Sequence, residues 1–173
     1  MNNNIYQIRT KRIAPEITIE SPIIASLKIE KRGKKLFAEV SFFNDGKEDV
    51  KLNVAQLGGD KLTQEVFFLK PFPSARNLTF SPYVPFFRNN NERYIVLKPK
   101  EQLVTTTELT KYYDLKERKY EKLYIVYSIK VQCVDEKDEP IMKCDKYGNT
   151  LPVVFFFWTK DVILSKDDIN ELL

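Results

Sequence analysis

The stretch that decides the fold lies near the middle of the chain and reads Tyr94-Ile95-Val96-Leu97-Lys98-Pro99-Lys100-Glu101-Gln102-Leu103. It continues as Thr105-Thr106-Thr107-Glu108-Leu109 and then as Tyr112-Tyr113-Asp114-Leu115. Apolar and polar side chains alternate in the first two parts, which is typical of strands with one buried face. The stretch therefore predicts two strands joined by a tight proline turn, followed by a corner that carries paired tyrosines.

Tyr112 and Tyr113, beside Asp114, could form an aromatic pair that binds a partner, but the sequence favours a structural role. In β-sandwiches a tyrosine at such a corner sends its ring into the core while its hydroxyl group holds the backbone of the corner. We therefore expect one of the two rings to enter the core.

The same alternation continues on both sides of this stretch. Turns separate the runs, notably the basic turn Lys31–Lys35 and the polar turn Asn44–Asp49, where Asp45-Gly46 can supply a positive φ. Roughly nine to eleven short strands with almost no helix predict an all-β fold, an antiparallel sandwich. The further runs that we expect to form strands are Pro15–Glu20, Ile23–Glu30, Leu36–Phe43, Val50–Gln56 as the continuation of a meander, Gln64–Leu69, Leu123–Cys133 and Val153–Trp158.

The run Val153–Trp158 is continuously apolar, which predicts a central strand buried on both faces. If it lay at a sheet edge instead, it would be a site for strand addition by another chain. After it, Ser165 and Asp168 have the spacing of a helix N-cap with an acidic partner, which predicts a short C-terminal helix.

The two cysteines of the chain, Cys133 and Cys144, flank an acidic turn, Asp135–Glu139. We expect Leu123–Cys133 to pair with Pro140–Cys144 across this turn. If the turn is centred near Asp138 and Glu139, the cysteines lie opposite each other at about 4.5–5.5 Å between Cβ atoms, near disulfide range. Reduced thiols are the favoured state because no secretory signal is visible, and a disulfide remains the alternative.

The acidic residues Asp135, Glu136, Asp138 and Glu139 could bind a hard cation such as calcium. Their spacing does not match a calcium-binding loop, so we expect a solvated hairpin tip. The chain has no histidine, which excludes Ser-His-Asp triads, Cys-His dyads and zinc sites with histidine ligands. We expect no catalytic, cofactor-binding or metal-binding residues and no enzymatic activity.

Charge and length further restrict the class of protein, the number of domains and the cellular compartment that we expect. The net charge is +4, from 28 basic and 24 acidic residues, a mixed surface that does not predict a nucleic-acid partner. The 173 residues fit one domain, with an N-terminal extension at 1–14, a sandwich at 15–164 and a C-terminal helix at 165–173. No membrane span and no signal core are visible, so a cytoplasmic protein is expected, or a periplasmic or secreted one if a leader is removed.

A segment rich in proline and aromatic residues, Lys70–Arg88, is the strongest candidate for a binding site. Proline cannot donate to a sheet ladder, so this segment should be an edge strand or a loop. Its large aromatic residues cannot easily all point inward, and aromatic and arginine side chains are enriched at interfaces. Core packing and edge cover are the alternative. The predicted partner-binding residues are Phe72, Arg76, Phe80, Tyr83, Phe86, Phe87, Arg88 and Arg93.

Short motifs give the chain a family resemblance. The run from Phe43 to Leu52 has the form strand, N-x-G-x-x-x-V, strand, which looks like an element of immunoglobulin-like domains. Over about residues 27–130 the order of motifs is similar to the immunoglobulin-like region that precedes the catalytic domain of deuterolysin-type and peptidyl-lysine metallopeptidases. The chain departs from that pattern in two places. The family has glycine where this chain has Ser81 or Lys100, and it has a glycine before the tyrosine of the last strand, where this chain has Lys119 or Leu123. The later motifs are Ser81-Pro82-Tyr83-Val84, Arg88, Tyr94–Pro99, Leu109-Thr110, Tyr113-Asp114-Leu115 and Tyr124-Ile125-Val126-Tyr127.

The resemblance implies an immunoglobulin-like sandwich without a catalytic domain within these residues. On this basis we expect a non-enzymatic binding protein of a bacterial cytoplasm. It would be an immunity or inhibitor protein that sterically masks a toxin, an effector or a hydrolase such as a peptidase. The alternative is a structural or assembly module that forms an oligomer, such as a homodimer, or an accessory subunit.

Overall fold

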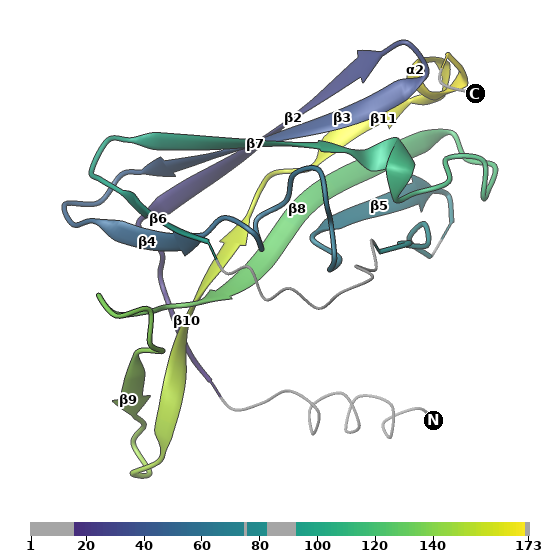
Figure 1. Ribbon diagram of the computed structural model, residues 1–173. Helices are drawn as coiled ribbons and strands as arrows, with labels where there is room; N and C mark the ends of the chain where they lie inside the picture. Colours follow the sequence, from purple (N-terminus) through teal and green to yellow (C-terminus); the bar gives the residue numbers. More distant parts are fainter. Residues whose placement is uncertain (1–15, 75, 83–92, 172–173) are drawn as a thin grey trace, which may run out of the picture.

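The computed structural model describes residues 16–74, 76–82 and 93–171 (Figure 1), and every structural statement refers to them. The predicted all-β sandwich with a short C-terminal helix is confirmed. The elements are β1 (Ile17–Ile19), β2 (Ile23–Arg32), β3 (Lys35–Asn44), β4 (Val50–Asn53), β5 (Phe67–Phe72), β6 (Tyr94–Leu97), β7 (Gln102–Glu108), the 3-10 turn η1 (Leu109–Lys111), β8 (Lys122–Gln132), β9 (Met142–Cys144), β10 (Thr150–Trp158), β11 (Val162–Ser165) and the helix α2 (Lys166–Asn170).

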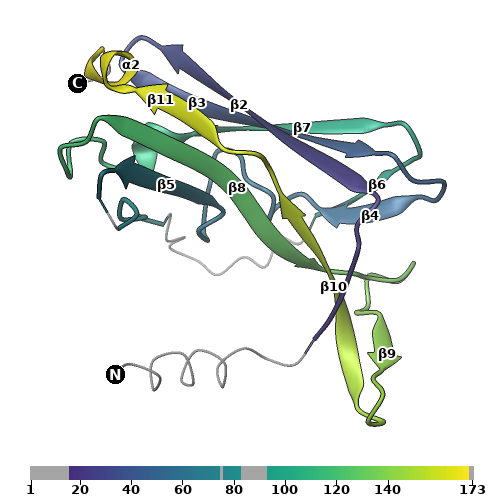
Figure 2. The same cartoon turned by 180° about the vertical axis from the view of Figure 1, so that it is seen from behind.

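Two sheets lie one above the other (Figures 1 and 2). One contains β2, β3 and β7, all antiparallel. The other is centred on β8, which pairs with β5 along one edge and with β10 and β11 along the other. β1 joins the outer edge of β10 in parallel, β9 pairs with the start of β10, and β4 pairs with β6.

The core lies between the two sheets. Leu36, Ala38, Val40 and Phe42 of β3 have no exposed surface, as their alternation predicts. The Phe42 ring meets the Tyr127 ring of β8 edge-on, with 5.7 Å between ring centroids. Burying one such side chain contributes about 1.5–3 kcal/mol, so this layer stabilises the sandwich.

β10 and β11 are one strand interrupted by a bulge. Trp158 lies opposite Ser128 and Val162 opposite Ile125, so one more residue lies between the pairs on this strand than on β8. Thr159 keeps the pairing, because its N–H donates to the Tyr127 carbonyl at 3.0 Å and its hydroxyl accepts from the Tyr127 N–H at 3.1 Å. The bulge leaves the next two residues, 160 and 161, exposed at the sheet surface.

The turn from β6 to β7 is tight, as expected, but it connects strands with different partners, since β6 pairs with β4 and β7 with β3. The buried Asn44 organises this turn. Its carbonyl accepts from the Lys100 N–H at 2.7 Å, and its side-chain amide donates to the Leu97 carbonyl at 2.9 Å. Lys100 has φ 68, a left-handed conformation that suits glycine better than a residue with a side chain.

The meander expected after β3 is wrong, because β4 does not pair with β3. Gly46 also does not have the positive φ that the turn pattern suggested. Its lack of a side chain matters for another reason: a Cβ atom at Gly46 would lie 2.7 Å from the Cβ atom of Pro22. Close approach of two backbone segments, rather than turn geometry, therefore requires this glycine.

The predicted pairing of Leu123–Cys133 with Pro140–Cys144 is wrong, because β10 is the antiparallel partner of β8 on that edge. The acidic turn is centred on Lys137 instead of near Asp138 and Glu139, because Val134 bridges Pro140 and the Cys133 carbonyl accepts from the Ile141 N–H. Cys144 lies opposite Thr150 instead. The two cysteines are therefore apart and free, Cys133 buried and Cys144 exposed.

The acidic turn is held to β4 by Lys51. The Lys51 ammonium group forms an ion pair with Asp138 and donates to the carbonyl oxygens of Asp135 and Glu136 at 3.3 and 3.2 Å. The positive charge beside the acidic turn, where the sequence suggested a bound calcium ion as an alternative, is thus supplied by Lys51.

Two further expectations are corrected in part. β5 begins later than predicted and continues through Pro71 to Phe72, as an edge strand within the described chain.

β10 is not buried on both faces: Val153 and Phe157 are buried, whereas Trp158 is 63% exposed. On the outward side of β10, Val154 is also buried, and the exposure increases toward Trp158 at the end of the strand.

The C-terminal helix begins with the predicted cap. The Ser165 hydroxyl accepts from the Asp168 N–H, and the Asp168 carboxylate accepts from the Ser165 N–H, a capping box. Lys31 pairs with Asp168 and Glu171, which joins α2 to the basic β2–β3 turn. That turn is the predicted hairpin tip, with Gly33 at φ 60.

Candidate functional site

The structure separates the predicted partner-binding residues. Phe72 lies on β5 and is 48% exposed. The Phe80 ring packs against the rings of Tyr112 and Tyr113, at centroid distances of 6.1 and 5.6 Å respectively. Phe80 therefore has the core-packing role that was the alternative to partner binding. Arg76 follows the end of β5, and Arg93 immediately precedes β6 in another sheet. Tyr83, Phe86, Phe87 and Arg88 lie outside the described residues.

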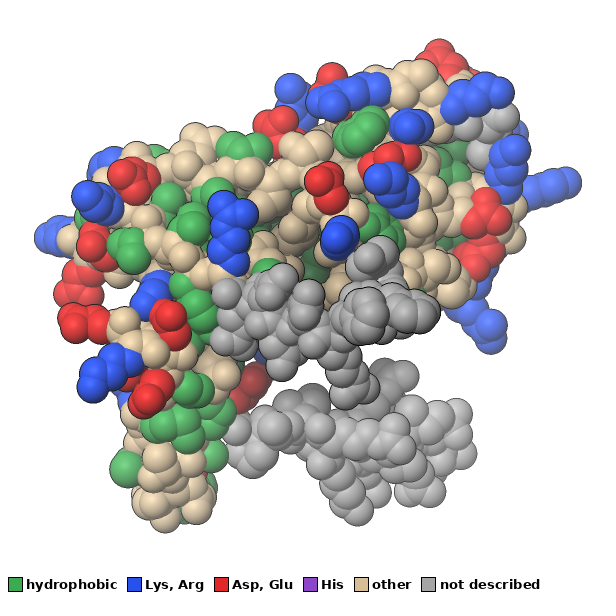
Figure 3. Space-filling model, viewed as in Figure 1, with side chains coloured by type: hydrophobic (Ala, Val, Ile, Leu, Met, Phe, Trp, Pro, Cys, Tyr) green, Lys and Arg blue, Asp and Glu red, His purple; other side chains and the backbone are tan. Residues whose placement is uncertain are grey.

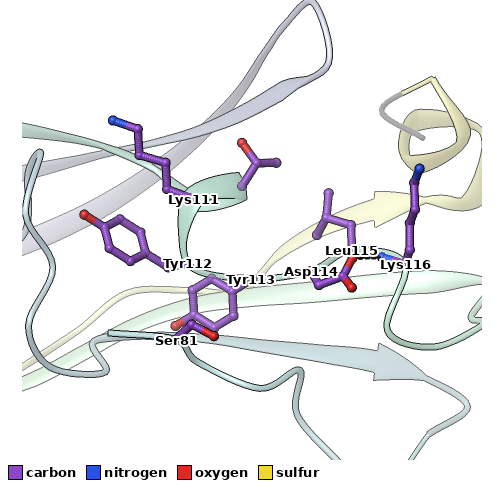
Figure 4. Close-up of a pocket in the computed structure, with 8 residues that line it drawn as sticks. Ser81, Lys111, Tyr112, Tyr113, Asp114, Leu115 and Lys116 are labelled. Atoms are coloured by element: carbon purple, nitrogen blue, oxygen red, sulfur yellow. Dashed lines mark hydrogen bonds between the residues drawn. The ribbon is translucent and has the colours of Figure 1, made fainter. Parts of the chain in front are cut away.

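A pocket of about 370 Å³ lies at the corner after β7 (Figure 4). Tyr112 and Tyr113 are both buried, whereas the sequence predicted that only one of the two rings would enter the core. The Tyr112 hydroxyl donates to the Asp60 carbonyl at 2.6 Å, and the Tyr113 hydroxyl donates to the Phe67 carbonyl. Burial raises the pKa of Tyr113 far above its ordinary value. These hydroxyl groups are committed to the fold, so the pocket belongs to a structural corner.

The outer face of the β8-centred sheet carries an unusual number of apolar side chains, which we call the aromatic face. Registered pairs place them side by side: Phe68 lies opposite Val126, and Tyr124 lies opposite Ile163. The rings of Phe156 and Trp158 lie 5.1 Å apart at their centroids. The aromatic face consists of Phe68, Phe72, Tyr124, Val126, Phe156, Trp158 and Ile163.

A depression of about 470 Å³ lies in the aromatic face. Phe68, Tyr124 and Val126 line it together with two charged residues, Lys70 and Asp161. Lys70 is on β5 and Asp161 is in the bulge between β10 and β11, so the two charges flank β8. Both are exposed, and neither forms an ion pair with another described residue. The depression is therefore apolar at its centre and oppositely charged at its two sides.

The aromatic face continues into a groove of about 560 Å³ at the seam between the sheets. Ile24 of β2, 55% exposed, and Trp158 of β10 are among its lining residues. Within the described chain, β1 pairs with β10 as far as Phe155, so the β10 edge is open beyond that residue. The bulge and the charge of Lys160 limit strand addition at this edge.

A hairpin arm, made of β9 and the first part of β10, projects from one end of the sandwich (Figures 1 and 2). Apolar side chains gather over it in the space-filling view (Figure 3). At its tip the Asp145 carboxylate accepts from the N–H groups of Tyr147 at 2.8 Å and Asn149 at 2.9 Å. Gly148 has φ 83. The ordered tip presents Tyr147, which is 76% exposed.

Among the members of the aromatic face, the sequence named only Phe72 as a partner-binding residue. It raised the run Val153–Trp158, which contains Phe156 and Trp158, as a strand-addition site only if that run lay at a sheet edge. The signal was present in β8, where Tyr124 and Val126 alternate with the core residues Leu123 and Ile125. A strand with polar residues on its outer face would show serine, threonine or lysine at those positions. Apolar residues on both faces indicate either double burial or an exposed apolar surface, and here it is the second.

The described residues contain no group of three or more cysteine, aspartate and glutamate side chains placed to hold a metal ion. No helix in the described ranges has the length and apolar character needed to cross a membrane. No protein-family model matches the chain, and no curated protein is similar to it in sequence. The resemblance to the metallopeptidase-associated domain thus stays a prediction.

Proposed function

We propose that this protein is a non-enzymatic protein-binding module that docks through its aromatic face. The observation that supports the proposal is the run of apolar side chains across three neighbouring strands, in which Phe72, Trp158 and Ile163 are 48%, 63% and 55% exposed. Soluble proteins rarely leave a large contiguous apolar patch exposed, and such patches mark interaction sites. Aromatic side chains are also enriched in interface cores.

The strands give this face the rigidity that binding requires. Tyr124 and Val126 lie on the central strand β8. Tyr124 is paired on both sides, with Lys70 of β5 and Ile163 of β11, and Val126 is paired with Phe68 of β5. Their backbone is already ordered before a partner arrives, so docking immobilises few additional groups. Preorganisation of this kind increases affinity by reducing the entropy lost on association.

The finer role that we propose is that of an immunity or inhibitor protein in a bacterial cytoplasm, acting by steric masking of a toxin, effector or hydrolase, such as a peptidase. The projecting arm suits this role, because Tyr147 stands at an ordered tip that can enter a cleft. A single exposed aromatic side chain on a rigid loop is a common anchor at interfaces.

An assembly module is the second candidate, and it uses the same surface. A homo-oligomer would bury the aromatic face against another copy of the chain. The two roles differ in the identity of the molecule that covers this face, so an experiment that identifies that molecule separates them.

Site-specific photocrosslinking in the source cell tests the proposal. A benzophenone amino acid replaces Phe72 or Trp158 on the aromatic face. The matched control position is Val104 on the outer face of β7, which is 45% exposed and belongs to the opposite sheet. We expect a discrete protein adduct from the first two positions and none from the control. Equal adducts from all three positions, or none at all, would argue against docking through this face.

A further inference from the structure

We infer that the aromatic face is covered by a second copy of this chain, in a two-fold dimer in which Lys70 of each copy meets Asp161 of the other. The inference rests on the second candidate given under the proposed function, the assembly module, since it names a second copy of the chain as the molecule that covers the docking surface. The observation that leads to it is the arrangement of opposite charges around the depression, with Lys70 on one side of β8 and Asp161 on the other.

Two-fold symmetry turns this arrangement into reciprocal contacts. In an isologous interface, if residue i of one subunit touches residue j of the other, then j also touches i. A two-fold axis that lies in the interface and runs parallel to β8 places β5 of one copy over β11 of the other. Each lysine then approaches an aspartate, and the apolar floors of the two depressions meet between them.

The register of the strands is compatible with this contact. Lys70 lies opposite Tyr124, whereas Asp161 lies just before Val162, which pairs with Ile125. The two charges are therefore offset along the sheet by about 7 Å or less, which is two residues of a strand. The flexible four-carbon stem of lysine can span such an offset.

The charges also favour self-association over docking onto a surface of one sign. A uniformly acidic partner would leave Asp161 facing like charge, and a uniformly basic one would do the same to Lys70. Like charges brought together in a partly desolvated interface oppose association. The depression is its own electrostatic complement, because its lining carries one charge of each sign on opposite sides of an apolar centre.

The size of the face sets the expected strength. Strands β5, β8 and β11 contain 6, 11 and 4 residues. With strands about 4.8 Å apart and a rise of about 3.3 Å per residue, they cover roughly 330 Å². This is below the roughly 800 Å² per partner that is typical of stable complexes. We therefore expect a reversible dimer with a dissociation constant in the micromolar range.

Sedimentation velocity of the purified full chain over a concentration series tests the inference. The wild-type protein should shift from monomer toward dimer as its concentration rises. Lys70→Asp and Asp161→Lys should each weaken association by roughly tenfold or more, because each puts like charges at both contacts. An equimolar mixture of the two variants should associate like the wild type, since every contact then joins a carboxylate to an ammonium group.

The control is Lys34→Asp at the exposed β2–β3 turn, which should not alter association. Trp158 is the single tryptophan of the chain, so its emission should shift to shorter wavelength on dimerisation and provides a second readout. A wild-type protein that stays monomeric at every concentration overturns the inference but leaves crosslinking to a different protein possible. A dimer that neither reversal weakens, or a mixture that fails to associate, overturns it as well.

Discussion

The hydroxyl group of Tyr113 donates a hydrogen bond to the backbone carbonyl of Phe67, which fastens the corner after β7 to β5. The pattern of hydrogen bonds between β5 and β8 explains why the Phe67 carbonyl is free to accept this bond. The Ser128 N–H bonds to the Val66 carbonyl, and hydrogen-bonded and non-bonded pairs alternate along antiparallel strands. The next pair, Phe67 with Tyr127, is therefore a non-bonded pair, and the Phe67 carbonyl points away from β8 toward the corner.

Tyr113→Phe should destabilise the protein by about 1–3 kcal/mol, because it leaves the buried Phe67 carbonyl without a partner. Urea denaturation measures the change in the free energy of unfolding. The matched control is Tyr124→Phe on the aromatic face, for which we expect a change within about 0.5 kcal/mol. Equal effects of the two substitutions would refute the structural role of the corner tyrosine.

Gly46→Ala should destabilise the protein by about 1–3 kcal/mol, because the added Cβ atom would overpack against Pro22. The same denaturation experiment measures this. Combining it with Pro22→Gly removes the contacting Cβ atom, so the double variant should lose less stability than the sum of the two single ones. Strict additivity would show that the close approach of these two residues is not the cause.

Local patterns in the sequence predicted the strands well, whereas the choice of strand partners depended on distant contacts. The alternation of β3 and β8, the Gly33 turn and the Ser165 cap are each encoded within a few residues, and each is confirmed. The partner of β8 was predicted as its nearest neighbour in sequence. The actual partner, β10, is favoured because its Phe157 packs against Phe42 of the opposite sheet, a contact that no local pattern reveals.

The candidate site shows the same limit. Phe72 was predicted from composition and is exposed, but Phe80, predicted on the same grounds, packs on the core. Apolar content alone does not show which way a side chain points. Trp158 illustrates the converse, because its apolar run predicted burial and the open outer face of the sheet exposes it.

Alkylation at neutral pH should modify Cys144 and spare Cys133. Burial raises the pKa of the Cys133 thiol to about 11, so little of the reactive thiolate is present, and the side chain is also shielded. Mass spectrometry after brief iodoacetamide treatment should find one adduct, located on the peptide that contains Cys144. Unfolding in urea should make both thiols reactive, and Cys144→Ser should abolish the fast reaction. Fast labelling of Cys133 in the native protein would contradict its buried position.

The tip of the arm should lose its order in acid. Hydrogen bonds from the Asn149 backbone, followed by weaker contributions from its side chain and from Tyr147, hold the pKa of Asp145 below its ordinary value of 3.8. A depressed folded-state pKa means that the stabilisation is complete above the ordinary pKa and is lost as the pH falls through the folded-state pKa. In an NMR titration from about pH 5 to about pH 2, the amide signals of Tyr147 and Asn149 should therefore move together with a midpoint below that of a free aspartate. Asp145→Asn should remove the transition, and a midpoint at or above 3.8 would show that the carboxylate does not hold the tip together.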